Sequence, residues 1–178
     1  MNYFRRFFGH LFTITKHRHL VIKHCKKAGI FWQGLRHDLS KYTPTEFRAG
    51  VKYYAGNHSP NEGERREHGY SLAWMHHKGR NKHHYEYWVD YNLETKQNEP
   101  VVMPYNYVAE MFCDRVAASK VYNGENYTEG SPLEYFEHRK PHRSINLETR
   151  DEIEKLLIML KEKGEEETFR YIRTRLGK

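Results

Sequence analysis

The segment LRHDLSKY, residues 35–42, places an imidazole and a carboxylate side by side at His37 and Asp38. Histidine nitrogen and carboxylate oxygen are both ligands for divalent transition metals, but the same dipeptide also suits a hydrogen-bonded structural pair. Neighbouring residues of a helix point about 100° apart, so both side chains reach one ion only near a helix end or when the ion lies between their two directions. Gly34 before the pair and residues 40–44 after it allow that placement.

Further imidazoles and one further acid recur along the chain, which holds 13 histidines. His17 and His24 share one face of an expected helix because they are seven residues apart. The candidates from later helices are His76, His77, His83, His84 and Asp114. Burying such groups without partners costs about 1–3 kcal/mol each. We therefore expect them to share one or two divalent ions, with Mn, Fe, Co, Ni or Zn better suited than Mg.

Most other histidines are expected to be ordinary surface residues. This set comprises His10, His19, His58, His68, His138 and His142. Of the pairs at positions 76–77 and 83–84, we expect only the inward member to take part in the site, because adjacent helical side chains diverge.

Apolar residues at helical spacing predict an all-α, single-domain helical bundle. A first helix is predicted over residues 4–29, either unbroken or divided near Gly9, and a second over residues 32–40. Further helices are predicted over residues 71–77, 82–89 and 103–122. Three more are predicted to begin at the start signals Thr43, Ser131 and Thr149, and a shorter one lies near the C-terminus. The polar residues 57–69 suggest a surface loop, and residues 90–103 a connection that could include a short hairpin.

The length of 178 residues suits one domain over residues 1–178, with a core at about residues 13–160 and C-terminal helices at 150–177 packed on it. A mean hydropathy of −0.97 predicts a very polar surface. The chain has no apolar stretch long enough to cross a bilayer and only two cysteines, so we expect a cytoplasmic protein.

The net charge of +7 favours anionic partners such as phosphate esters. The basic residues look scattered and interleaved with acids, which disfavours a nucleic-acid groove. The phenylalanine-rich N-terminus with Arg5 and Arg6 suits a membrane surface. We expect it instead to pack or to form a homodimer, without a membrane partner.

The order of a histidine, a His-Asp doublet, further histidines and a final aspartate on successive helices resembles the HD superfamily of metal-dependent phosphohydrolases. The blocks HDLSKYTPTEF, AWMHHKGRNKHHYEYW and MPYNYVAEMFCDRVAAS look like those of DUF5662, an uncharacterised bacterial and phage family, over about residues 13–160. The resemblance implies an HD-domain-like bundle and says little about the substrate.

The resemblance also implies a ligand set. It comprises His17, His37, Asp38 and Asp114 for one metal, with His77 and one of His83 or His84 completing a second site. We assign His84 to the metal and His83 to the substrate. His17 is preferred to His24 because KHRHLV matches the family's first block. We expect His24 and Glu110 to contact the ligand side chains without binding the metal themselves.

The expected activity is that of a metal-dependent phosphohydrolase, a phosphomonoesterase or phosphodiesterase, acting on a nucleotide or another small phosphate ester. The metal would polarise a phosphoryl oxygen and lower the pKa of a water ligand, and Asp38 or a neighbouring imidazole would accept the proton. Candidate phosphate-binding side chains are Lys41, Arg80, Lys82 and Arg115. The alternatives are a di-iron oxygenase at the same site and a non-catalytic protein that binds nucleotides or nucleic acid.

Overall fold

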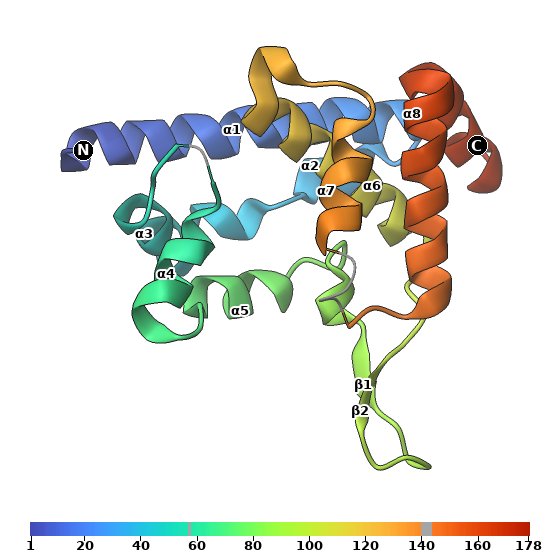
Figure 1. Ribbon diagram of the computed structural model, residues 1–178, viewed down its shortest axis with the longest axis horizontal. Helices are drawn as coiled ribbons and strands as arrows, with labels where there is room; N and C mark the ends of the chain where they lie inside the picture. The colour runs from blue at the N-terminus through green and yellow to red at the C-terminus, as the bar shows by residue number, and fades with distance from the viewer. Residues whose placement is uncertain (57, 140–143) are drawn as a thin grey trace.

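The computed structural model describes residues 1–56, 58–139 and 144–178. In chain order its elements are α1 (Tyr3–Lys27), α2 (Phe31–Arg36), η1 (Leu39–Tyr42), α3 (Pro44–Lys52), α4 (Pro60–His68), α5 (Leu72–Lys78), η2 (Tyr85–Tyr87), β1 (Val89–Tyr91), β2 (Asn98–Pro100), α6 (Tyr105–Asn123), η3 (Gly124–Asn126), α7 (Ser131–Arg139) and α8 (Leu147–Arg175). The protein is therefore mostly helical, as its apolar periodicity predicts (Figure 1).

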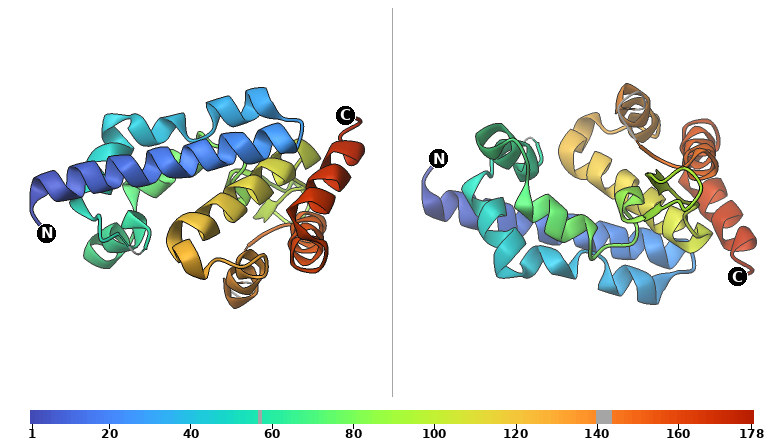
Figure 2. Two further views of the ribbon diagram at one scale, coloured as in Figure 1. Left: turned by 90° about the horizontal axis from the view of Figure 1, so that it is seen from above. Right: turned by 90° about the horizontal axis from the view of Figure 1, so that it is seen from below.

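Helix α1 is a single unbroken helix of 25 residues, so the alternative of a division near Gly9 is wrong. The side chain of Asn2 accepts a hydrogen bond from the amide of Arg5 and caps its start. Gly29, with a φ of +78°, follows its end in the left-handed conformation that glycine adopts easily. The helix extends along one side of the molecule, and most of the other helices lie beneath it (Figures 1 and 2).

The apolar core lies between the C-terminal half of α1 and helices α6, α7 and α8. Its largest fully buried apolar side chains are Phe112, Phe136, Ile153, Leu156, Leu157, Leu160 and Ile172. Helix α8 packs against both α6 and α7 and bends at Gly164, whose φ of +80° interrupts the helical backbone. The apolar core thus occupies one end of the bundle and leaves the inside of the other end to polar residues.

Two predicted boundaries are wrong. The segment predicted as a loop over residues 57–69 contains α4, whose first residue Pro60 and trailing Gly69 are ordinary start and stop signals; residue 57 lies outside the described residues. The helix predicted over residues 32–40 ends at Arg36, and the backbone turns before η1 begins.

The helix predicted over residues 82–89 is also wrong, because that segment holds only the short 3₁₀ turn η2. Buried Asn81 begins this segment, and its side-chain amide donates to the carbonyl oxygen of His77 at 2.8 Å and to Oγ of Ser40 at 2.8 Å. These bonds hold the segment across the end of α5 in an irregular path. The short hairpin at residues 90–103 is confirmed: β1 pairs antiparallel with β2, and the hairpin projects from the body (Figure 1).

Among the described residues, no helix combines the length and the apolar character needed to cross a bilayer.

Gly34, which lies three residues before His37, allows α2 to approach α1 closely. A Cβ atom at this position would lie 2.5 Å from Cβ of Cys25. We expect Gly34→Ala to lower the free energy of unfolding by about 1–3 kcal/mol, because the clash outweighs the gain of about 1 kcal/mol in helix propensity. Urea unfolding measures the effect, with Gly130→Ala as the control, since its Cβ would meet nothing closer than 3.6 Å. Equal unfolding midpoints for Gly34→Ala and wild type would contradict this packing.

Candidate metal centre

The His-Asp doublet lies in the turn between α2 and η1. Asp38 adopts the left-handed conformation with a φ of 55°, which aspartate tolerates better than most residues other than glycine. Arg18 stabilises the preceding turn, because its guanidinium donates to the carbonyl oxygens of Leu35 and of His37, the latter at 3.2 Å. This break in the helix allows both side chains of the doublet to face the same space, although the sequence predicted that the helix continues to residue 40.

The first group of possible ligands comes from α1, this turn and α6. Its members are His17, His37, Asp38 and Asp114, with ligand atoms all within 4.8 Å of one another. Nε2 of His17 lies 3.0 Å from Oδ1 of Asp114 and 3.7 Å from Oδ2 of Asp38. Nε2 of His37 lies 3.2 Å from Oδ2 of Asp38 and 3.5 Å from Oδ1 of Asp114.

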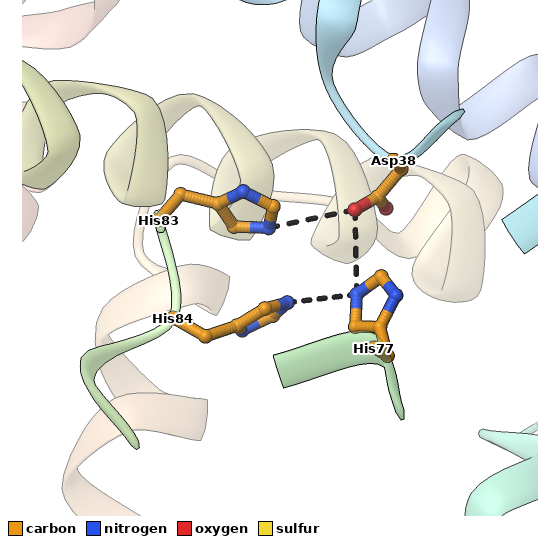
Figure 3. Close-up of side chains that lie close together, drawn as sticks. All are labelled: Asp38, His77, His83 and His84. Carbon is orange, nitrogen blue, oxygen red and sulfur yellow. Dashed lines mark hydrogen bonds and ion pairs between the residues drawn. The ribbon is translucent and has the colours of Figure 1, made fainter. Parts of the chain in front are cut away.

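The second group uses the other oxygen of Asp38 (Figure 3). Its members are Asp38, His77, His83 and His84, from the doublet, α5 and the segment after it. Oδ1 of Asp38 lies 3.3 Å from Nε2 of His77 and 3.5 Å from Nε2 of His83. The Nε2 atoms of His77 and His84 face each other at 2.9 Å, so one ring must be a donor unless both bind a cation. Asp38 is thus common to both groups.

Both groups have the properties of a metal site. Bonds of about 2.1 Å to one ion place adjacent ligand atoms about 3.0–3.4 Å apart. Three of the seven separations fall in this range, and the others extend from 2.9 to 3.7 Å. Five of the buried atoms make no hydrogen bond of ordinary geometry: Nε2 of His17, His37 and His83, and both carboxylate oxygens of Asp38, of which Oδ2 forms an ion pair with Lys41. Buried polar atoms are rarely left in this state unless something satisfies them. The nitrogen and oxygen donors fit a divalent transition metal.

Two buried glutamates orient the histidines from behind. Nδ1 of His37 donates to Oε1 of Glu110 at 2.8 Å, and Nδ1 of His83 lies 3.2 Å from the same oxygen. Nδ1 of His77 donates to Oε2 of Glu46 at 2.7 Å. A carboxylate on Nδ1 fixes the tautomer that leaves the Nε2 lone pair for a metal. Glu110 therefore occupies the position that the sequence suggested, whereas Glu46 was not predicted.

The electrostatics of the cluster keep its carboxylates ionised. Burial raises the pKa of Asp38, but His37 and Lys41 outweigh it, and the pKa lies well below its usual range. Burial likewise opposes ionisation of Asp114, but the close approach of His17 helps to lower its pKa well below the ordinary value. Burial and the neighbouring His83 lower the pKa of His84, which is therefore neutral at pH 7.

A cavity of about 200 Å³ opens beside the two groups. It is lined by residues that include His17, His77, His84 and Asp114 from the site and Lys41, Tyr54 and Asn61 around it. Nζ of Lys41 lies 2.6 Å from Oδ2 of Asp38. Burial lowers the pKa of Lys41, but Asp38 and Asp114 outweigh it and raise the pKa, so the side chain is a cation beside the site.

Three of the predicted phosphate-binding side chains do not reach this cavity. Arg80 is exposed and contacts the carbonyl oxygen of His76, and Lys82 lies over the rings of Tyr87 and Tyr107. Arg115 lies over the ring of Phe136. These predictions are corrected, because charge and nearness in sequence do not determine the direction of a long side chain.

Several histidine predictions are also corrected. His24 contacts the carbonyl oxygen of Cys113 and the ring of Phe169, so it lies away from the ligands. His83 and His84 both face the site, because their segment is not helical and adjacent side chains need not diverge.

His10, predicted at the surface, is only 6% exposed and lines the cavity. Burial and the nearby Lys41 lower the pKa of His10 to about 4. His142 lies outside the described residues.

Glu46 had a signal in the sequence that was interpreted otherwise. In TPTEF it stands three residues after Thr43, which is the spacing of a capping box. The Thr43 side chain does not cap α3, however, and donates to the carbonyl oxygen of Ser40 at 2.6 Å. Glu46 instead accepts hydrogen bonds from His76 and His77. The role of Glu46 is therefore identified by its contacts with the histidine pair and not by its spacing from Thr43.

Fold and site together define a mostly helical protein whose buried His/Asp groups can hold metal ions. The chain belongs to DUF5662, a family of unknown function, whose sequence pattern matches residues 6–159. This range includes every member of both groups. No curated protein and no solved structure matches the chain.

Substitution of a candidate ligand should cost more bound metal than substitution of an acid that only orients a ligand. Asp38→Asn keeps the volume and tolerates the left-handed backbone but removes the shared charge, so most bound metal should be lost. Glu46→Gln leaves every ligand in place but weakens the orientation of His77, so affinity should fall about 10–100-fold. Elemental analysis and chelator titration of protein purified without a metal-binding tag measure both. The control is Glu67→Gln, a surface acid paired with Lys52. Wild-type metal content in Asp38→Asn would contradict the assignment.

Proposed function

We propose that this protein is an HD-type metal-dependent phosphohydrolase that hydrolyses a nucleotide or another small phosphate ester. The observation that carries the proposal is the shared carboxylate of Asp38, which faces histidines of two adjacent ligand groups beside an open cavity. A bound divalent ion at such a site polarises a phosphoryl oxygen and lowers the pKa of a water ligand. Manganese, iron, cobalt, nickel and zinc match the donor atoms better than magnesium does.

The chain's own contribution is to bind and orient the ester. Lys41 is the only lysine or arginine among the described residues that line the cavity, so the protein supplies a single fixed positive charge there. One such charge suits a single phosphoryl group better than a triphosphate. The aromatic rings of Tyr54, Trp74 and Tyr122 line other parts of the wall and offer apolar contact to the remainder of the substrate.

The role of Lys41 predicts a separation between metal binding and turnover. Lys41→Ala should keep its metal, because lysine is not a ligand, but should lower kcat/KM for a phosphate ester about 100-fold through loss of a charged donor. Phosphate release from a panel of monoesters and diesters measures this, with elemental analysis of the same preparations. The control is Lys52→Ala, whose side chain is paired with Glu67 on the surface. Equal turnover by Lys41→Ala and wild type, or no release from any ester by metal-loaded wild type, would refute the proposal.

The second candidate is a di-iron oxygenase at the same residues. The three imidazoles of the second group, close to the first, favour it because two ions would then share Asp38. Oxygen uptake and an optical band on oxidation of the iron-loaded protein, both lost in His77→Ala and in His84→Ala tested separately, distinguish this chemistry from hydrolysis.

A further inference from the structure

The positive charge of the chain is concentrated near its N-terminus. Residues 1–45 hold nine of the 30 lysines and arginines but only one of the 23 acids, the buried Asp38. The remaining residues hold 21 basic and 22 acidic side chains and are close to neutral. The scattered, interleaved distribution expected from the whole sequence is therefore wrong for this segment, because it accounts for all of the net charge of +7.

The same segment exposes a row of aromatic rings. Phe4, Phe8 and Phe12 follow one another at four-residue spacing on α1 and are 72%, 62% and 68% exposed. On another side of the helix Phe7 packs against Phe47, with ring centroids 5.2 Å apart. Of the two expected outcomes, packing within the protein is thus wrong for three of the four phenylalanines, and the formation of a homodimer stays a prediction.

Basic residues continue this row toward the C-terminal half of α1. Lys16 follows Phe12 at the same spacing, and Lys23 and Lys26 lie farther along; all three are exposed. Within the described parts of the chain, none of the three forms an ion pair with an acid. The outer face of α1 is left uncovered by the other helices (Figures 1 and 2). One face of a single helix is therefore apolar at its N-terminal end and cationic toward its C-terminal end.

We propose that this face of α1 binds the surface of an anionic lipid bilayer. The rings of Phe4, Phe8 and Phe12 would lie at the boundary between headgroups and acyl chains, and Lys16 and Lys23 would lie against the lipid phosphates. Exposed aromatic rings and lysines on one helix are the features of a helix that lies in the membrane interface. The charge complements an anionic surface, where each lysine or arginine contributes about a fivefold gain in affinity.

Two other occupants fit the face less well. A second copy of the chain would bring two segments of like charge together, which opposes association. Single-stranded nucleic acid is bound by aromatic rings interleaved with basic side chains along a groove. Here the rings and the lysines are separated along the helix, so a base stacked on a ring would leave its phosphate without a partner. The proposal is independent of the chemistry at the metal centre.

Sedimentation of the full chain with vesicles tests the proposal. The protein should bind phosphatidylcholine vesicles that contain phosphatidylglycerol, should bind much less to pure phosphatidylcholine, and should be released as NaCl approaches about 0.5 M. Phe8→Ser with Phe12→Ser should weaken partitioning about tenfold or more, because apolar contact is lost. Lys16→Gln with Lys23→Gln should weaken it about 25-fold.

Matched surface variants provide the controls. Leu93→Ser removes a 74% exposed apolar side chain from the hairpin, and Lys161→Gln with Lys163→Gln removes two exposed charges from α8. Both should partition like wild type, and all variants should keep the wild-type circular dichroism and melting temperature. Three results would overturn the proposal: unchanged vesicle binding in both α1 variants, a vesicle-free dimer that dissociates in the phenylalanine variant, or binding of a single-stranded oligonucleotide but not of vesicles.

Discussion

The burial of Asp38 with both carboxylate oxygens facing imidazole nitrogens is the constraint on which the centre of this structure depends. A carboxylate that is 1% exposed destabilises a fold unless cations or hydrogen-bond donors surround it. Lys41 supplies one positive charge, but Asp114, Glu110 and Glu46 add further negative charge within the same cluster. Divalent ions would balance that excess and satisfy the unpartnered nitrogen atoms, so metal binding and the stability of this region are linked.

The rest of the bundle is arranged so that this polar cluster can be tolerated. Helices α1 and α6 each serve two regions: His17 and Asp114 face the site, whereas Val21 and Phe112 are fully buried in the apolar core. The apolar core with α7 and α8 supplies hydrophobic stabilisation that offsets the cost of the polar end. Three of the candidate ligands, His17, His77 and Asp114, therefore come from helices, whereas the doublet and the His83-His84 segment lie in irregular backbone between helices. This combination holds the ligand atoms near one another and leaves one side open to the cavity.

The sequence predicted the helices with clear apolar periodicity, α1 and α6. It placed the doublet inside a helix over residues 32–40 and allowed for a helix end there, whereas the helix ends at Arg36. It did not predict α4, because that helix is polar on nearly all sides and only its start and stop signals identify it. The path of residues 82–89 was also missed, since it depends on hydrogen bonds that Asn81 makes to residues brought close by folding.

The candidate ligands could be chosen from residue type and order, because buried imidazoles and carboxylates need partners and a metal ion can satisfy several of them at once. The direction in which each long side chain points was harder to predict. Arg80, Lys82 and Arg115 were chosen by charge, and each turns toward a carbonyl or a ring outside the cavity. Glu46 was missed because its contact with His77 joins residues 31 positions apart, a distance at which a capping pattern gives no information.

Anomalous diffraction from a manganese-loaded crystal is the most direct test of a shared aspartate. The structure predicts peaks on either side of Asp38, one among His17, His37 and Asp114 and the other among His77, His83 and His84. Occupancy of both groups would place each carboxylate oxygen about 2.0–2.2 Å from an ion. A single peak on one side would reduce the centre to one metal but keep Asp38 as its ligand. A crystal that binds manganese elsewhere, with Asp38 still paired only to Lys41 and the histidines, would contradict the account.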